Sequence, residues 1–172
     1  MPKRLLKKEV LFFCLLTYGK VGKEKGAEVA IGFSSIFWNT AWTRSQPPHT
    51  LGILCDPKHP VFSEFPTEYQ SNWQWWDPVS HSQAMILNGF PSNLKPLIQP
   101  IDTWFKNRRL ALAFESKTGN GKILVCSIEM KNSISERPVT EQLLLSILKY
   151  MNSNSFNPQK EVELSKIRTL FN

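Results

Sequence analysis

Two apolar runs on either side of a glycine-bearing turn constrain the fold of this chain most strongly. Leu110–Glu115 and Lys122–Ile128 flank the segment Lys117–Gly121. This arrangement predicts an antiparallel hairpin. Pro138 then suits the first turn of a helix, and apolar residues follow it at three- and four-residue spacing, which predicts a helix over 138–151 with one buried face. The apolar positions of that helix are Leu143, Leu144, Ile147, Leu148 and Met151.

Further strand-like segments lie before the hairpin. Glu9–Leu16 is a continuous apolar run, which is typical of a strand buried on both faces. Glu28–Trp38 and Leu51–Cys55 predict two more strands, and the second of these ends at Asp56-Pro57. A plausible strand within His81–Leu87 and an extended segment, Leu97–Ile101, complete the set.

The mixture of strands with a terminal amphipathic helix predicts an α/β fold built in layers, with a mixed sheet and flanking helices. A chain of 172 residues, 41% of them apolar, fits a single domain over 1–172 that buries a real core. We assign the α/β core to residues 7–151. Residues 152–172 are expected to form a polar tail with a short, weakly amphipathic helix.

The charge distribution and the apolar runs exclude two classes of partner. The net charge is +7, but the basic residues are scattered and accompany no nucleic-acid motif, so no nucleic-acid binding is expected. Val10–Leu16 is far shorter than the roughly 20 residues that span a bilayer, so no membrane helix is expected. The same run follows a basic start but precedes no small-residue cleavage site, which favours a buried strand over a signal peptide. The sequence does not assign the protein to a cellular compartment.

Cysteine and histidine positions predict no metal site and no cofactor. The three cysteines lie inside or at the end of strand-like apolar runs, and an odd number without ligand spacing is typical of small core residues. No two histidines have the spacing of ligands on one element. The residues concerned are Cys14, Cys55, Cys126, His49, His59 and His81.

A tryptophan-rich run carries the main functional question. Ser71–Asp77 holds three of the six tryptophans within four positions. Tryptophan is seldom fully buried and its N–H needs a partner, so the run forms either an anchored corner or a platform for a flat ligand such as a sugar ring. We favour the structural interpretation for Trp75 and for at least one of Trp38 and Trp42. The candidate carbohydrate-binding residues are Trp38, Asn39, Trp42, Asn72, Trp73, Gln74, Trp76 and Asp77.

Independent catalysis is not favoured by the grouping of acidic residues. Retaining glycoside hydrolysis needs two carboxylates a few ångströms apart. Glu64 and Glu68 straddle Pro66, which disfavours a shared helical face, and Asp56 before Pro57 suits a turn cap. No catalytic residue is therefore assigned.

Several strings resemble the C-terminal region of large bacterial glycoside hydrolases of the family 2 type, which are called β-galactosidase-like or sugar-binding-domain proteins. The central strings are Leu51–Pro60, Phe65–Tyr69 and Ser71–Asp77. They are specific, because rare Trp and Pro residues recur in order. Weaker matches reach from about Lys7 to Phe171 and include Ile98–Asp102, Gly121–Ser127, Arg137-Pro138 and the leucine-rich helix.

The resemblance implies a flavodoxin-like layered domain of the class I glutamine-amidotransferase type, in a complete or an incomplete form. Family 2 hydrolysis uses two glutamates on a (β/α)₈ barrel of roughly 250 residues, which exceeds this chain. No cysteine lies in a glycine-flanked nucleophile elbow either. The implied function is a non-catalytic accessory domain whose partners are the catalytic and sugar-binding domains of a glycoside hydrolase, a family that is often periplasmic or secreted. A stand-alone glycan-binding module is the alternative, and homo-oligomer formation stays open.

Overall fold

The computed structural model describes residues 11–15, 20–32, 49–103 and 105–171, and for residues 11–15 it describes the backbone alone. The main sheet has five strands in the order β1-β7-β6-β4-β2. The β1–β7 pair is parallel and the other three pairs are antiparallel, so the predicted mixed sheet is confirmed. A second sheet pairs β3 with β5 in antiparallel fashion. The strands are β1 (Leu11–Leu15), β2 (Ile53–Leu54), β3 (Met85–Ile86), β4 (Pro96–Pro100), β5 (Leu110–Ala111), β6 (Ala113–Thr118) and β7 (Gly121–Cys126).

The predicted hairpin is formed by β6 and β7, with Gly119 at φ +56° in the turn. This backbone conformation favours glycine because a Cβ would be strained there. The first apolar run is split at Leu112, whose N–H donates to Ile98 O at 2.8 Å and whose carbonyl accepts from Ser127 N at 2.8 Å. Leu110–Ala111 therefore leaves the hairpin and pairs with β3 instead.

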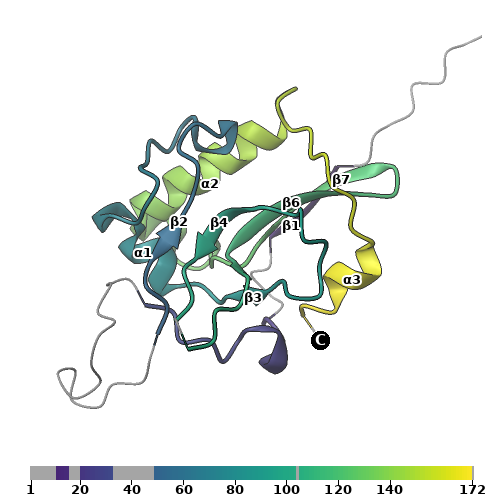
Figure 1. Ribbon diagram of the computed structural model, residues 1–172. Coiled ribbons are helices and arrows are strands. Elements are labelled where there is room, and N and C mark those ends of the chain that lie inside the picture. Colours follow the sequence, from purple (N-terminus) through teal and green to yellow (C-terminus); the bar gives the residue numbers. More distant parts are fainter. Residues whose placement is uncertain (1–10, 16–19, 33–48, 104, 172) are drawn as a thin grey trace, which may run out of the picture.

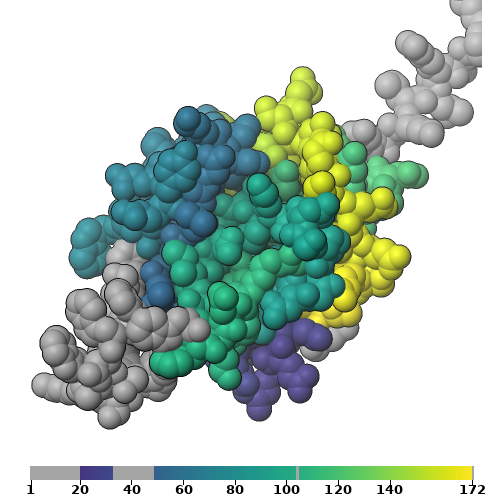
Figure 2. Space-filling model, viewed as in Figure 1, coloured from purple at the N-terminus to yellow at the C-terminus, as the bar shows by residue number. Residues whose placement is uncertain are grey.

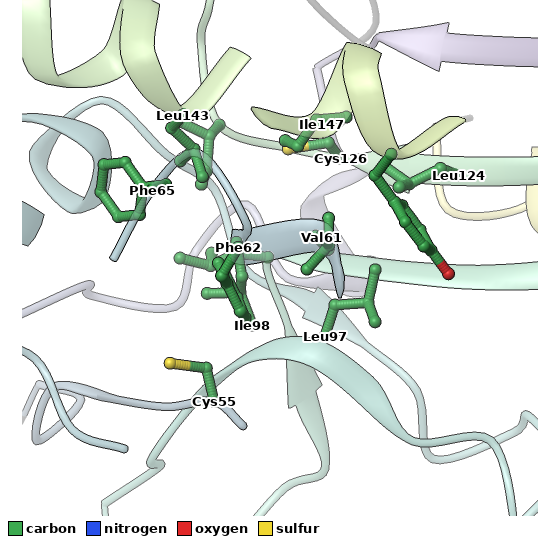
Figure 3. Close-up of a cluster of buried hydrophobic side chains, with 14 of the residues drawn as sticks. Cys55, Val61, Phe62, Phe65, Leu97, Ile98, Leu124, Cys126, Leu143 and Ile147 are labelled. Atoms are coloured by element: carbon green, nitrogen blue, oxygen red, sulfur yellow. The ribbon is translucent and has the colours of Figure 1, made fainter. Parts of the chain in front are cut away.

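Helix α2 (Pro138–Met151) has the predicted bounds and covers one face of the sheet. Its Leu143 and Ile147 are buried in one cluster with Leu124 and Cys126 of β7. Figure 3 shows these side chains gathered between the helix and the strand, beside the 3₁₀ turn Pro60–Phe62. The remaining helical elements are α1 (Trp76–Ser80), α3 (Leu164–Arg168) and the 3₁₀ turns Lys23–Lys25, Trp73–Trp75 and Ile134–Glu136.

Residues 162–171 cover the opposite face of the sheet, while Phe156 packs in the cluster on the α2 side. Ile123 and Val125 of β7 alternate with the residues that face α2, and they lie in a second buried cluster with Ile167 of α3. Lys117 N donates to Lys160 O at 2.7 Å, so the chain just before these residues runs beside the end of β6. Figure 1 shows α2 and α3 on opposite sides of the hairpin, and Figure 2 shows the C-terminal segment against the middle of the chain. The predicted short helix is present, but its segment belongs to the core.

Three expected strands differ from the structure, and of these Leu51–Cys55 is reduced to the two residues of β2. Glu28–Gly32, the described part of the expected strand Glu28–Trp38, forms no strand, and Gly32 N donates instead to Thr50 Oγ1 at 2.9 Å. The expected strand within His81–Leu87 shrinks to the two residues of β3. Within the described ranges, no helix has the length and apolar character needed to cross a membrane.

Cys55 and Cys126 are buried and free, as the sequence predicts for core residues, while the side chain of Cys14 lies outside the described part of the structure. Burial raises the pKa of Cys55 to about 11 and that of Cys126 to about 12.

We expect both thiols to resist modification in the folded protein. In a Cys14→Ser background, a disulfide reagent should react at least about 100-fold more slowly under native conditions than in denaturant, because the thiolate is the reactive form and access is blocked. Absorbance of the released thiol measures this rate. Complete labelling of both thiols in the native protein, at the rate observed in denaturant, would contradict the prediction.

Candidate functional site

The tryptophan run folds as a 3₁₀ turn, Trp73–Trp75, that continues directly into α1. Asn72 caps the turn, since its Oδ1 accepts a hydrogen bond from Gln74 N at 3.1 Å. Because neighbouring residues on such a turn point in different directions, the run cannot present all three indoles on one face. Trp75 points inward, and Trp73 and Trp76 point outward.

Trp75 is an internal anchor. Its side chain is 0% exposed, and its Nε1–H donates to Thr67 Oγ1 at 2.8 Å. Its ring lies edge-on to Phe65 and Phe62, with centroid distances of 5.1 and 6.2 Å. The structural interpretation of Trp75 is confirmed.

Trp73 and Trp76 form an exposed aromatic pair. They are 80% and 53% exposed, and their ring centroids lie 6.1 Å apart at an interplanar angle of 45°. The rings are tilted with respect to each other, so they do not form a flat platform. We call these two residues the tryptophan pair.

The polar neighbours of the tryptophan pair already have internal partners. Gln74 Nε2 donates to Pro66 O at 2.8 Å, which ties the turn to the preceding loop. Asp77 is held by an ion pair with Arg137. Sugar recognition needs polar groups that are free to bind hydroxyls. Together with the cap at Asn72, these contacts show that each of the three polar candidates makes at least one contact within the corner.

Five of the eight candidate residues are thus brought together at one corner: Asn72, Trp73, Gln74, Trp76 and Asp77. The other three, Trp38, Asn39 and Trp42, lie outside the described residues. Of the acidic side chains weighed for catalysis, Glu64 pairs with Lys149 at 3.1 Å on the surface. In the described ranges, no three His, Cys, Asp or Glu side chains are grouped to hold a metal ion.

A polar network fixes this corner to the start of α2. Arg137 Nε donates to Asp77 Oδ1 and Oδ2 at 2.9 and 3.0 Å, and its Nη1 donates to Glu129 Oε2 at 2.7 Å. Thr140, in the first turn of α2, also donates to Asp77 Oδ2. We call these four residues the Arg137 clasp. The Arg137 side chain is 11% exposed, so the clasp is largely shielded from water.

The clasp holds its carboxylates in the charged form. Burial alone would raise the pKa of Asp77, but hydrogen bonds from Arg137 and Thr140 and the neighbouring positive charges outweigh it, so the pKa falls below 3.8. Glu129 behaves in the same way, because hydrogen bonds from Asn132 N and Lys131 N and the charge of Arg137 exceed the effect of burial and lower its pKa below 4.5. The sequence interpretation missed this network, although the pair Arg137-Pro138 was visible as a motif.

The fold and this corner together define a layered, mixed α/β domain with an exposed tryptophan pair on a rigid support. The chain matches the family described as "Domain of unknown function (DUF8487)" over residues 4–172 and belongs to that family. No curated protein matches the chain.

Proposed function

We propose that this chain is a non-catalytic accessory domain of a carbohydrate-active glycoside hydrolase of the family 2 type, and that the tryptophan pair lies in the surface that docks onto the catalytic and sugar-binding domains. The sequence resemblance supports the parent family, because its most specific strings, Leu51–Pro60 and Ser71–Asp77, include the corner itself. The flavodoxin-like, amidotransferase-like arrangement belongs to the same proposal. The parallel β1–β7 pair and the covered sheet faces support it, whereas the three antiparallel pairs distinguish this sheet from an all-parallel one.

One observation carries the docking function: two exposed indoles stand on a corner whose neighbouring polar side chains each make a contact within the domain. Tryptophan is enriched in protein interfaces, where its large area is buried at low entropic cost. A sugar-binding surface would instead need the amides and the carboxylate beside the rings to bind hydroxyls. The arrangement therefore favours a protein partner over a glycan at this corner.

The test is binding of the full chain to the catalytic and sugar-binding portion of a family 2 glycoside hydrolase from the same genome, expressed without its own C-terminal domain. We expect a saturable complex that the double substitution Trp73→Ala and Trp76→Ala weakens at least tenfold, because tryptophan is enriched among the interface hot spots whose loss costs about 2 kcal/mol or more. Biolayer interferometry measures the dissociation constant.

Phe105→Ala is the matched control, since Phe105 is 71% exposed but lies on the loop between β4 and β5. It should leave the affinity unchanged. Absence of a complex, or equal weakening by Phe105→Ala, would contradict the proposal. A saturable change in tryptophan fluorescence with galactosides or glucuronides that requires the tryptophan pair would favour the glycan-binding alternative, and self-association through the pair would favour a homo-oligomer.

A further inference from the structure

A cavity of about 340 Å³ lies apart from the tryptophan pair. It is bordered by the loop after β2, the segment that leads into β4, the middle of β6 and residues 159–160. Small-molecule sites in proteins have volumes of roughly 300–1,000 Å³, so this cavity has room for a ligand at the small end of that range. None of its lining residues belongs to the tryptophan corner or to the Arg137 clasp.

Glu115 of β6 is oriented in this cavity by α2. The hydroxyl of Tyr150, a residue that is 3% exposed, donates to Glu115 Oε2 at 2.6 Å. Burial, with Glu115 beside it, raises the pKa of Tyr150, so the phenol keeps its proton and continues to donate. One carboxylate oxygen is thereby fixed, and the other, Oε1, receives no hydrogen bond from the described residues. A carboxylate held in this way is a preorganised acceptor.

His59 lines the same cavity as Glu115. Its Nδ1 accepts a hydrogen bond from Val61 N at 3.2 Å, and its ring lies edge-on to Tyr150 with a centroid distance of 5.3 Å. Burial lowers the pKa of His59 despite the nearby charges of Glu115 and Asp56, which favours the neutral ring. With Nδ1 acting as acceptor, the proton of the neutral ring resides on Nε2. The same cavity is thus lined by a fixed acceptor and a defined N–H donor.

The charges around the cavity cancel. Asp56 and Glu115 contribute two negative charges, and the lining residues Lys95 and Lys160 contribute two positive charges. Because the positive and negative charges of the lining balance, the cavity favours neither an anion nor a cation, which points to a ligand without net charge. Leu94 and Leu97 add apolar walls, which suit the C–H face of a ring.

We propose that this cavity binds a neutral sugar ring, with Glu115 accepting hydrogen bonds from hydroxyls and His59 Nε2–H donating to one. Polyhydroxy rings combine an apolar face with many hydroxyls that both donate and accept, and the cavity offers partners for each. This site is independent of the proposed docking function, because the two surfaces share no residue.

The test is a titration of the full chain, followed by ¹H–¹⁵N NMR, with methyl galactoside, methyl glucoside, glucuronate and glycine. We expect one of the neutral sugars to give saturable shifts of amides around the cavity with a dissociation constant on the order of 1 mM. Glu115→Gln should weaken this binding about tenfold, since the amide replaces one acceptor oxygen with a donor. Asp56→Asn, at an exposed position where the cap to Lys58 N can be kept, should weaken it without changing the fold.

Glu68→Gln is the matched control, because Glu68 is exposed and lies outside the cavity, and it should bind as the wild type does. The Trp73→Ala and Trp76→Ala protein should also keep sugar binding, which separates this site from the docking surface. Failure of both neutral sugars to give saturable shifts would overturn the proposal. Preferential binding of glucuronate or glycine, or binding that is unaffected by both cavity variants, would overturn it as well.

Discussion

Replacing Trp75 by alanine is expected to lower the free energy of unfolding by about 3–5 kcal/mol. The side chain is 0% exposed, and its removal leaves a cavity between Phe62 and Phe65, whose edge-on contacts are also lost. Thr67 Oγ1 would lose the hydrogen bond that it accepts from Trp75 Nε1 at 2.8 Å. Equilibrium urea unfolding followed by far-UV circular dichroism measures the change as a shift in the midpoint.

Trp73→Ala is the matched control for this substitution, because the two residues share one 3₁₀ turn and differ in burial. Trp73 is 80% exposed, so its replacement should change stability by no more than about 0.5 kcal/mol. Trp75→Phe should fall between the two, since it keeps much of the ring but loses the hydrogen bond to Thr67. Comparable destabilisation by Trp73→Ala and Trp75→Ala would contradict the inward and outward assignment of these indoles.

The local elements were predictable because their signals are local. The hairpin turn carries its own glycine, and α2 carries both a first-turn proline and an apolar stripe, so their assignment needed no knowledge of distant contacts. The division within Leu110–Glu115 was not predictable. It depends on Leu112 bonding to Ile98, and that pairing is decided by where β4 runs.

For the tryptophan run, the composition was informative but the direction of each side chain was not predictable. Its composition indicated that some indoles anchor and others remain exposed, but the direction of each side chain follows from the 3₁₀ turn that Asn72 caps. Only that geometry places Trp75 inside and Trp73 and Trp76 outside.

The polar constellations were missed because their members are distant in sequence. Asp77 and Arg137 are separated by 60 positions, and Glu115 and Tyr150 by 35. Neither pair has a spacing that a sequence pattern would reveal. The sequence predicts a polar tail for residues 152–172 for a related reason: the buried residues there, among them Phe156 and Val162, are isolated in a polar sequence. Only the folded structure gathers them into two clusters on opposite faces of the sheet.

A rigid support under exposed indoles is what a docking surface requires. Trp75 fixes the corner from within, and the Arg137 clasp fixes it to α2, so the tryptophan pair is presented without a large loss of conformational freedom on binding. The stability of the clasp therefore bears on the proposed function as well as on the fold.

Replacing Arg137 by alanine is expected to lower the free energy of unfolding at neutral pH by about 3 kcal/mol, which is the lower end of the range for breaking a buried ion pair. The variant leaves Asp77 and Glu129 charged and partly buried without their shared guanidinium. Lys23→Ala is the control, since the Lys23–Glu28 pair is exposed and should contribute no more than about 1 kcal/mol. Urea unfolding measures both variants, and equal effects would contradict the role of the clasp.

The pH dependence of this difference tests the mechanism. The pKa values of Asp77 and Glu129 lie below 3.8 and 4.5 in the folded protein, so their contribution to stability is fully present above those ordinary values and is lost as the pH falls through the lower, folded values. Without Arg137 the pKa values of both groups move back up. The stability difference between wild type and Arg137→Ala should therefore be largest at neutral pH and shrink as the pH falls below the ordinary pKa values of the two carboxyls, 4.5 for Glu129 and 3.8 for Asp77. The pKa of Asp102 is also lowered, because hydrogen bonds from Arg108 outweigh the effect of burial. Asp102 is present in both proteins, so its pH-dependent contribution to stability cancels in the difference. A difference that stays constant down to the acid transition would show that Arg137 acts through packing and not through its charge.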